Sequence, residues 1–96
     1  MKYLVVDASL NGTGIRDEYN GGYISPDSIG LSNGLIQKIN HWLNLYAEEI
    51  YKGYSNLILL ENLDKEGVEI ALKIKTELKD VKILYFSAAK MQKYIL

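Results

Sequence analysis

One run of apolar residues at helical spacing constrains this chain more than any other feature. The run consists of Leu35, Ile39, Trp42, Leu43, Tyr46 and Ile50, at steps of four, three, one, three and four residues. Such spacing places the side chains on one face of an α-helix. Ser32 before the run is a favourable N-cap, and Gly53 after it is a favourable stop. The sequence therefore predicts a helix between these two residues, with one buried face.

Short β-branched and aromatic runs lie near both ends of the chain. Residues 2–8 predict a buried strand that ends at Asp7-Ala8-Ser9, and residues 81–86 predict another. The long helical excursion between them permits the two strands to pair in parallel. Residues 9–22 contain several glycines and asparagines and predict turns and a mobile loop. Tyr23-Ile24 then predicts a brief second strand in a hairpin with the first.

A second helix is predicted over residues 63–79, with Asn62 or Asp64 as its cap. Its apolar stripe includes Gly67, which has poor helix propensity, so we expect it to let another backbone come close. Residues 57–60 suit a short buried strand or a helical turn equally well. Residues 87–96 suggest a short terminal helix or a tail.

These elements predict an α/β (or α+β) fold in a single domain over residues 1–96. A small sheet of two to four strands carries two main helices, in the order β-(β)-α-(α or β)-α-β. A chain of this length buries roughly two-thirds of its unfolded surface, which is enough for a two-layer core.

The absence of cysteine restricts both chemistry and compartment. It excludes disulfides, thiolate zinc sites, iron–sulfur clusters and cysteine nucleophiles. Small secreted domains usually carry disulfides, so the cytoplasm is the expected location. The apolar run at the N-terminus stops at Asp7 after four residues, unlike a signal peptide, and no stretch approaches a membrane span. A net charge of −1 predicts no direct nucleic-acid binding.

Residues that could support catalysis do not form a recognisable set. The Asn11–Gly14 loop follows a strand, but it lacks the Gly-Lys-Ser/Thr ending of a P-loop. Asp7 and Ser9 lie at the end of a strand, and His41 is the only histidine, yet no nucleophile-elbow sequence surrounds Ser9. His41 also lacks companion ligands at metal-binding spacing. We therefore predict no enzyme activity, metal or cofactor.

Tyrosines and carboxylates instead suggest a protein-binding surface. Eight of the ten aromatic residues are tyrosine, a residue enriched at interfaces. Carboxylates gather in the N-terminal loops and around the start of the second helix. An acidic, aromatic surface of this kind complements the basic cleft of a nuclease. The candidate contacts are Asp17, Glu18, Tyr19, Tyr23, Asp27, Glu61, Asp64 and Glu66.

Two stretches carry a resemblance to a known family. The first stretch comprises residues 21–32 and continues through Leu35, Trp42 and Tyr46. The second comprises Glu66-Gly67 and the stripe that follows through Glu77-Leu78. Over roughly residues 20–85 the chain resembles short bacterial proteins found beside polymorphic toxins, including immunity proteins of contact-dependent growth inhibition systems. The resemblance implies a cytoplasmic inhibitor that binds a cognate toxin domain, often a nuclease. We expect the free protein to be a monomer. The matching residues are scaffold, and residues 9–20 and 53–62, which do not match, would hold the specificity.

Two other functions remain open from the sequence. One is a small enzyme or nucleotide-binding domain that uses Asp7 and the Asn11–Gly14 loop. The other is a regulatory module that homodimerises through an exposed strand edge.

Overall fold

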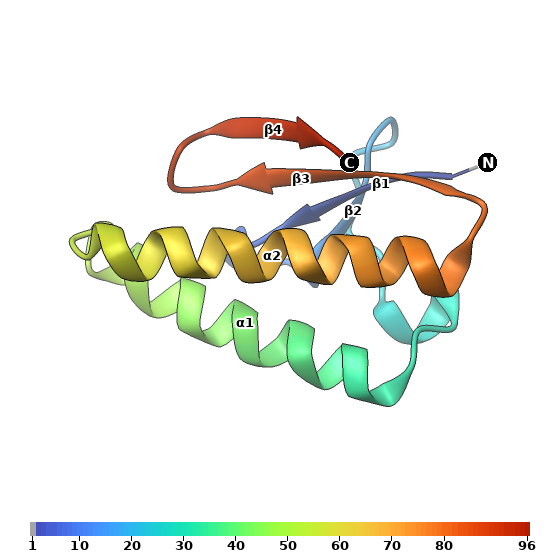
Figure 1. Cartoon of the computed structure of the whole chain (residues 1–96), viewed down its shortest axis with the longest axis horizontal. Coiled ribbons are helices and arrows are strands. Elements are labelled where there is room, and N and C mark those ends of the chain that lie inside the picture. The colour runs from blue at the N-terminus through green and yellow to red at the C-terminus, as the bar shows by residue number, and fades with distance from the viewer. Residues whose placement is uncertain (1) are drawn as a thin grey trace.

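A mixed four-stranded sheet with the order β2-β1-β3-β4 organises the molecule (Figure 1). The computed structural model describes residues 2–96. The strands are β1 (Lys2–Asp7), β2 (Ile15–Asp17), β3 (Val81–Ser87) and β4 (Gln92–Ile95). The central strands β1 and β3 are parallel, with Lys2 opposite Val81, and both outer strands pair antiparallel. The predicted parallel pairing between the two ends of the sequence is confirmed.

Two long helices, α1 (Asn33–Tyr51) and α2 (Leu57–Leu78), lie side by side under one face of the sheet (Figure 1). A short 3₁₀ helix, η1 (Pro26–Ile29), precedes them. The hydroxyl of Ser32 accepts a hydrogen bond from the Leu35 N–H at 3.3 Å, which confirms the predicted cap of α1. The fold is therefore a small α/β fold with two helices on one sheet. Neither helix of the described chain has an apolar stretch long enough to cross a membrane.

The second helix starts at Leu57 and not near residue 63 as predicted. Asn56 caps it, and its side-chain oxygen accepts the Leu59 N–H at 3.0 Å. The predicted caps Asn62 and Asp64 therefore lie inside the helix. Residues 57–60 are helical because Leu60 and Leu63 continue the buried stripe toward the N-terminus at the helical spacing.

The second strand of the sheet is Ile15–Asp17, which the sequence suggested was loop. Ile15 is fully buried, and Arg16 lies opposite Val5 of β1. Tyr23 and Ile24 do not pair with β1 as predicted. They flank β2 on its outer side, where Tyr23 forms one bridge to Arg16. A strand of three residues is too short to display the alternation by which strands are recognised.

The C-terminal segment forms β4, so the predicted helix or tail at residues 87–96 is wrong. The turn that joins β3 to β4 contains no glycine, asparagine or proline, and Met91 adopts a left-handed conformation with φ of 54°. Hydrogen bonds to residues distant in the sequence hold this turn, so it does not need the residues that usually form turns, as described below.

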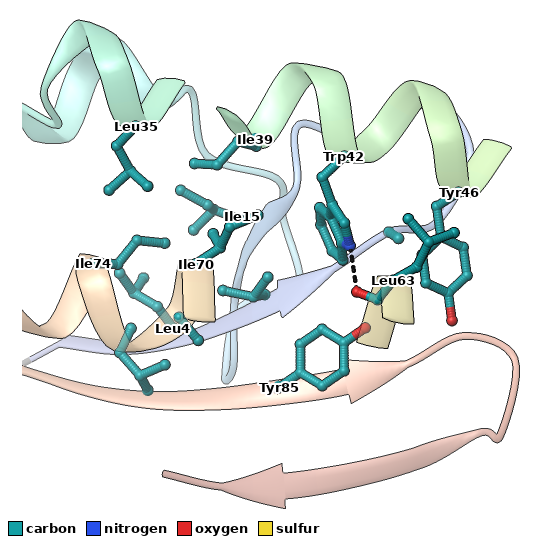
Figure 2. Close-up of a cluster of buried hydrophobic side chains, with 14 of the residues drawn as sticks. Leu4, Ile15, Leu35, Ile39, Trp42, Tyr46, Leu63, Ile70, Ile74 and Tyr85 are labelled. Atoms are coloured by element: carbon teal, nitrogen blue, oxygen red, sulfur yellow. Dashed lines mark hydrogen bonds between the residues drawn. The ribbon is translucent and has the colours of Figure 1, made fainter. Parts of the chain in front are cut away.

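The core lies between the sheet and the helix pair (Figure 2). Trp42 of α1 is fully buried there, and its indole N–H donates to the Leu63 carbonyl of α2 at 2.8 Å. This hydrogen bond joins the middle of α1 to the first third of α2. Gly67 of α2 faces the ring of Tyr85, so the close approach predicted at this glycine is to an aromatic side chain and not to a backbone.

The opposite face of the sheet carries its own charged side chains. Residues that alternate with the core-facing ones point to this face, and Val5 is fully buried there although no helix covers it. Arg16, next to Val5, forms an ion pair with Asp7 at 3.1 Å. Glu18 and Lys93 form a second pair at 2.8 Å, which links the segment after β2 to β4.

Candidate protein interface

A hydrogen-bond network centred on Asp64 joins both helices to the β3–β4 turn. Oδ1 of Asp64 accepts from the hydroxyls of Tyr46 at 2.9 Å and Tyr85 at 2.6 Å, and Oδ2 accepts from Ser87 at 2.8 Å. The Tyr46 hydroxyl in turn accepts the Ala89 N–H, and the Ser87 hydroxyl accepts the Lys90 N–H. These bonds fix the turn to α1 and α2.

The same network keeps its tyrosines protonated. Burial raises the pKa of Tyr46 to about 12, although the Ala89 N–H opposes the shift. Burial also raises the pKa of Tyr85, and the hydrogen bond to Asp64 adds to the effect. Both tyrosine hydroxyls therefore act as donors at neutral pH, and together with the Ser87 hydroxyl they occupy the Asp64 carboxylate. A carboxylate so occupied joins α2 to α1 and to β3.

The loop proposed for nucleotide binding contacts α1 away from the N-terminus of that helix. At Gly14, an added Cβ would lie 2.8 Å from Ile39 Cγ2, so the loop packs against the middle of α1. The N-terminal amides of α1, which would attract an anion, begin at Asn33. Asp7 is buried and already bonded to Arg16, to the Ser9 hydroxyl at 2.6 Å and to the Ser9 N–H.

His41 does not complete a catalytic set with these residues. It is exposed on α1, and within residues 2–96 it makes no hydrogen bond to Asp7 or Ser9. Across the same residues, no three His, Asp or Glu side chains gather closely enough to hold a metal ion.

Two adjoining grooves lie where the start of α2 meets the β3–β4 turn. The larger, of about 570 Å³, is bounded by α2 on one side and by Tyr85, Lys90 and Tyr94 on the other. The smaller, of about 170 Å³, lies between the α1–α2 connection and the turn. Glu61, Asp64 and Lys90 line both, so the two grooves form one continuous depression. We call this depression the hairpin-end groove.

Large apolar side chains are exposed around this groove. Leu57 lines its smaller part and is 73% exposed, and Ile58 beside it is 77% exposed. Tyr51 at the end of α1 is 80% exposed, and Met91 in the β3–β4 turn is 75% exposed. The end of α1, the start of α2 and this turn lie at the same end of the molecule (Figure 1). Exposed apolar groups gathered at one place are characteristic of protein contact sites.

Two candidate contacts of the N-terminal loops, Glu18 and Tyr19, have their backbone beside the start of β1. The Glu18 N–H donates to the Tyr3 carbonyl near the start of β1, which lies beside the start of β3. Tyr19 contacts the edge of the Tyr3 ring, with centroids 5.0 Å apart. A helix of 22 residues is about 33 Å long. The backbone at Glu18 and Tyr19 is therefore far from the start of α2, although the Glu18 carboxylate reaches Lys93 of β4.

Several of these N-terminal candidates have local structural roles. The Asp17 carboxylate accepts the N–H groups of Tyr19 and Asn20, and the Asn20 N–H is the main reason that the pKa of Asp17 is lowered. Glu18 is paired with Lys93. Tyr23 covers Gly12, where an added Cβ would lie 2.5 Å from its ring. Tyr19 and Asp27 remain exposed.

The three candidates on α2 separate by position. Glu61 is exposed and lines the hairpin-end groove, whereas Asp64 lines it but is committed to the tyrosine network. Glu66 is half-buried and does not line the groove.

The exposed apolar residues Tyr51, Leu57, Ile58 and Met91 were not among the predicted contacts. The signal for one of them was present in the sequence. When residues 57–60 are counted as helix, the stripe through Leu60 and Leu63 leaves Ile58 on the opposite face, whereas Leu57, three residues before Leu60, lies at the margin of the stripe. Apolar residues outside a buried stripe are the ones that a partner can cover.

No protein-family model and no curated protein sequence matches this chain.

Proposed function

We propose that this protein is a cytoplasmic immunity protein that binds and neutralises a cognate bacterial toxin domain. The observation that supports this most strongly is the exposed apolar cluster of Tyr51, Leu57, Ile58 and Met91 beside the hairpin-end groove. Water solvates such side chains poorly, and their burial against a partner would supply binding free energy. The resemblance of residues 20–85 to immunity proteins identifies the class of partner.

Glu61 and Glu69, which line the groove together with Lys65 and Lys90, would face basic groups of the partner, as in the substrate cleft of a nuclease. Glu61 lines the groove from an exposed position, so it would act at the rim of the interface. Rim charges mainly change the association rate and its dependence on salt, whereas the covered apolar groups govern dissociation. Inhibition would then follow because the bound protein covers the working surface of the toxin.

The test uses the toxin domain encoded beside this gene, with binding measured by calorimetry. Ile58→Ala should weaken binding by about tenfold, the effect of about 1.4 kcal/mol expected at a central contact. Leu72→Ala is the matched control. Leu72 is another exposed apolar residue of α2, 46% exposed, and it lies fourteen positions from Ile58, or about 21 Å along the helix.

The control should leave the affinity within about threefold of the original value. Equal losses from both substitutions would contradict the assignment of the surface. Absence of any binding by the neighbouring toxin domain would contradict the immunity function itself.

A further inference from the structure

The outer side of β4 is an unoccupied sheet edge. On its inner side β4 pairs with β3, and the Leu96 N–H donates to the Ile83 carbonyl at 3.1 Å. Bonded and non-bonded pairs alternate along an antiparallel ladder. Gln92 and Tyr94 therefore direct their backbone groups toward β3, whereas Lys93 and Ile95 direct their N–H and C=O groups outward. In the described sheet no strand lies beyond β4 to receive them.

The opposite edge of the sheet is covered. Tyr23 bridges to Arg16 on the outer side of β2, and the Ile24 N–H donates to the Ile15 carbonyl at 2.9 Å. The segment at Tyr23 and Ile24 thus occupies the groups that β2 would present. Of the two edges, only that of β4 is open to a further strand.

The larger part of the hairpin-end groove runs between β4 and α2, on the helix side of the sheet. Tyr94 of β4 stacks on Tyr85 of β3, with ring centroids 6.4 Å apart and planes 19° from parallel. Both rings line the groove, and Val68 of α2 lines it from the facing side. Its centre is therefore apolar, and the charged groups Glu61, Lys65 and Glu69 lie along its α2 side.

A strand added to β4 would use both features at once. Its backbone would bond to Lys93 and Ile95, and every second side chain would point to the helix side of the sheet. Those side chains would enter the groove between β4 and α2. We propose that an extended segment of the partner toxin domain, with apolar residues at alternate positions, adds to β4 and fills this groove.

The identity of the partner rests on the proposed function, whereas the mode of binding rests on the edge and the groove. A second copy of this chain is a poorer occupant. Its own β4 would direct only Gln92 and Tyr94 to the helix side, and these are already bonded to each other at 2.8 Å. Tyr94 is also stacked on Tyr85 within its own molecule. An extended segment of another protein brings side chains that are not already bonded or stacked within this chain.

Amide hydrogen exchange measured by NMR, with and without the neighbouring toxin domain, tests this mode directly. In the free protein, the amides of Lys93 and Ile95 should exchange rapidly, while that of Tyr94 is protected by β3. Binding should slow exchange at Lys93 and Ile95 by about tenfold or more, since both amides would gain acceptors. Binding that leaves these two amides fast would overturn the strand-addition mode and leave the immunity function intact.

Substitutions at Ile95 give a second test. Proline at this position removes the outward N–H and preserves the bonds to β3, as edge strands tolerate. Ile95→Pro should weaken toxin binding by about tenfold, the effect of one lost interfacial hydrogen bond. Ile95→Ala, which keeps the N–H, should change affinity by about threefold or less. Thermal unfolding of both variants verifies that each is folded.

Three results would count against the proposal. Equal effects of the two substitutions would show that the N–H is not used. If the amides of Lys93 and Ile95 exchange slowly in the free protein, and more slowly as the protein concentration rises, the edge is occupied by a second copy of this chain. Failure of the toxin domain to bind at all would remove both this proposal and the proposed function.

Discussion

Replacement of Gly67 by alanine should destabilise the protein, although alanine is the better helix former. A Cβ at this position would overlap Cε1 of Tyr85 and lie 2.6 Å from Cζ and 2.8 Å from the hydroxyl oxygen. Tyr85 cannot yield easily, because it is fully buried and its hydroxyl bonds to Asp64 at 2.6 Å. The ring or the helix must therefore shift.

The magnitude follows from two opposing effects. Overpacking of a core costs about 1–3 kcal/mol, whereas the gain in helix propensity is at most about 1 kcal/mol. Because the overlap with the buried Tyr85 ring is severe, the cost should be about 2–3 kcal/mol and the net loss about 1–2 kcal/mol, which for a domain of this size lowers the Tm by roughly 4–16 °C. Gly67→Leu should be worse. Gly34→Ala is the matched control, because an added Cβ there meets no atom within 4 Å, and its Tm should be unchanged or higher.

A double-mutant cycle assigns the loss to the Tyr85 ring. In a Tyr85→Leu background, the alanine at position 67 should cost much less, with a coupling of about 1 kcal/mol or more by calorimetry. A rise in Tm for Gly67→Ala alone, or an equal cost in both backgrounds, would refute the argument from close approach.

Three further predictions concern the core and its polar network. Trp42→Ala should cost about 3–5 kcal/mol in denaturant unfolding, and a water-exposed Trp emission maximum in the native protein would contradict the observed burial. Asp64→Ala should cost about 1–3 kcal/mol by the same assay, since three hydroxyls lose their acceptor, and an unchanged midpoint would dispute the network. Stability should fall as pH rises from about 10 through 12. Unfolded tyrosines ionise near pH 10, whereas burial raises the pKa of Tyr46 to about 12 and raises that of Tyr85. The contribution of these neutral tyrosines is therefore complete below pH 10, and Tyr46→Phe should flatten the alkaline part of a Tm profile.

Elements with strong local signals were predictable from the sequence. The stripe that contains Trp42, with Ser32 before it, identified α1 and its cap, and the apolar runs at both ends identified β1 and β3. Gly67 was recognisable as a close approach because a glycine on an apolar stripe lowers helix propensity without an evident local reason. Its neighbour was not predictable, since the approach of Tyr85 depends on how the sheet sits on α2.

The elements that were missed depend on contacts between distant residues. Tyr46 holds Ala89, and Asp64 holds Ser87, whose hydroxyl in turn accepts the Lys90 N–H, so the β3–β4 turn needs no glycine or asparagine of its own. β2 contains charged residues, as loops often do. Its Arg16 is paired with Asp7 of β1 on the face of the sheet that no helix covers. Neither partner is close in sequence, and local patterns could not reveal them.

The candidate site was predicted only in part, for a similar reason. Glu61 was identified as a candidate, and it lines the groove. Asp64 was chosen as a surface carboxylate, yet hydroxyls from residues 18 to 23 positions away occupy it. The groove and the free edge of β4 could not be predicted without the strand order.

The order of the strands also has a consequence for how the chain folds. The two central strands, β1 and β3, come from residues 2–7 and 81–87, so the middle of the sheet is its most non-local part. Loop closure over so many residues is slow compared with formation of a helix pair between adjacent segments. During synthesis, β1 must wait until β3 has been made, and the apolar faces of α1 and α2 remain uncovered by a sheet for that interval. The complete sheet therefore forms only in a slow, late step, and until then the unfinished chain is most prone to aggregate.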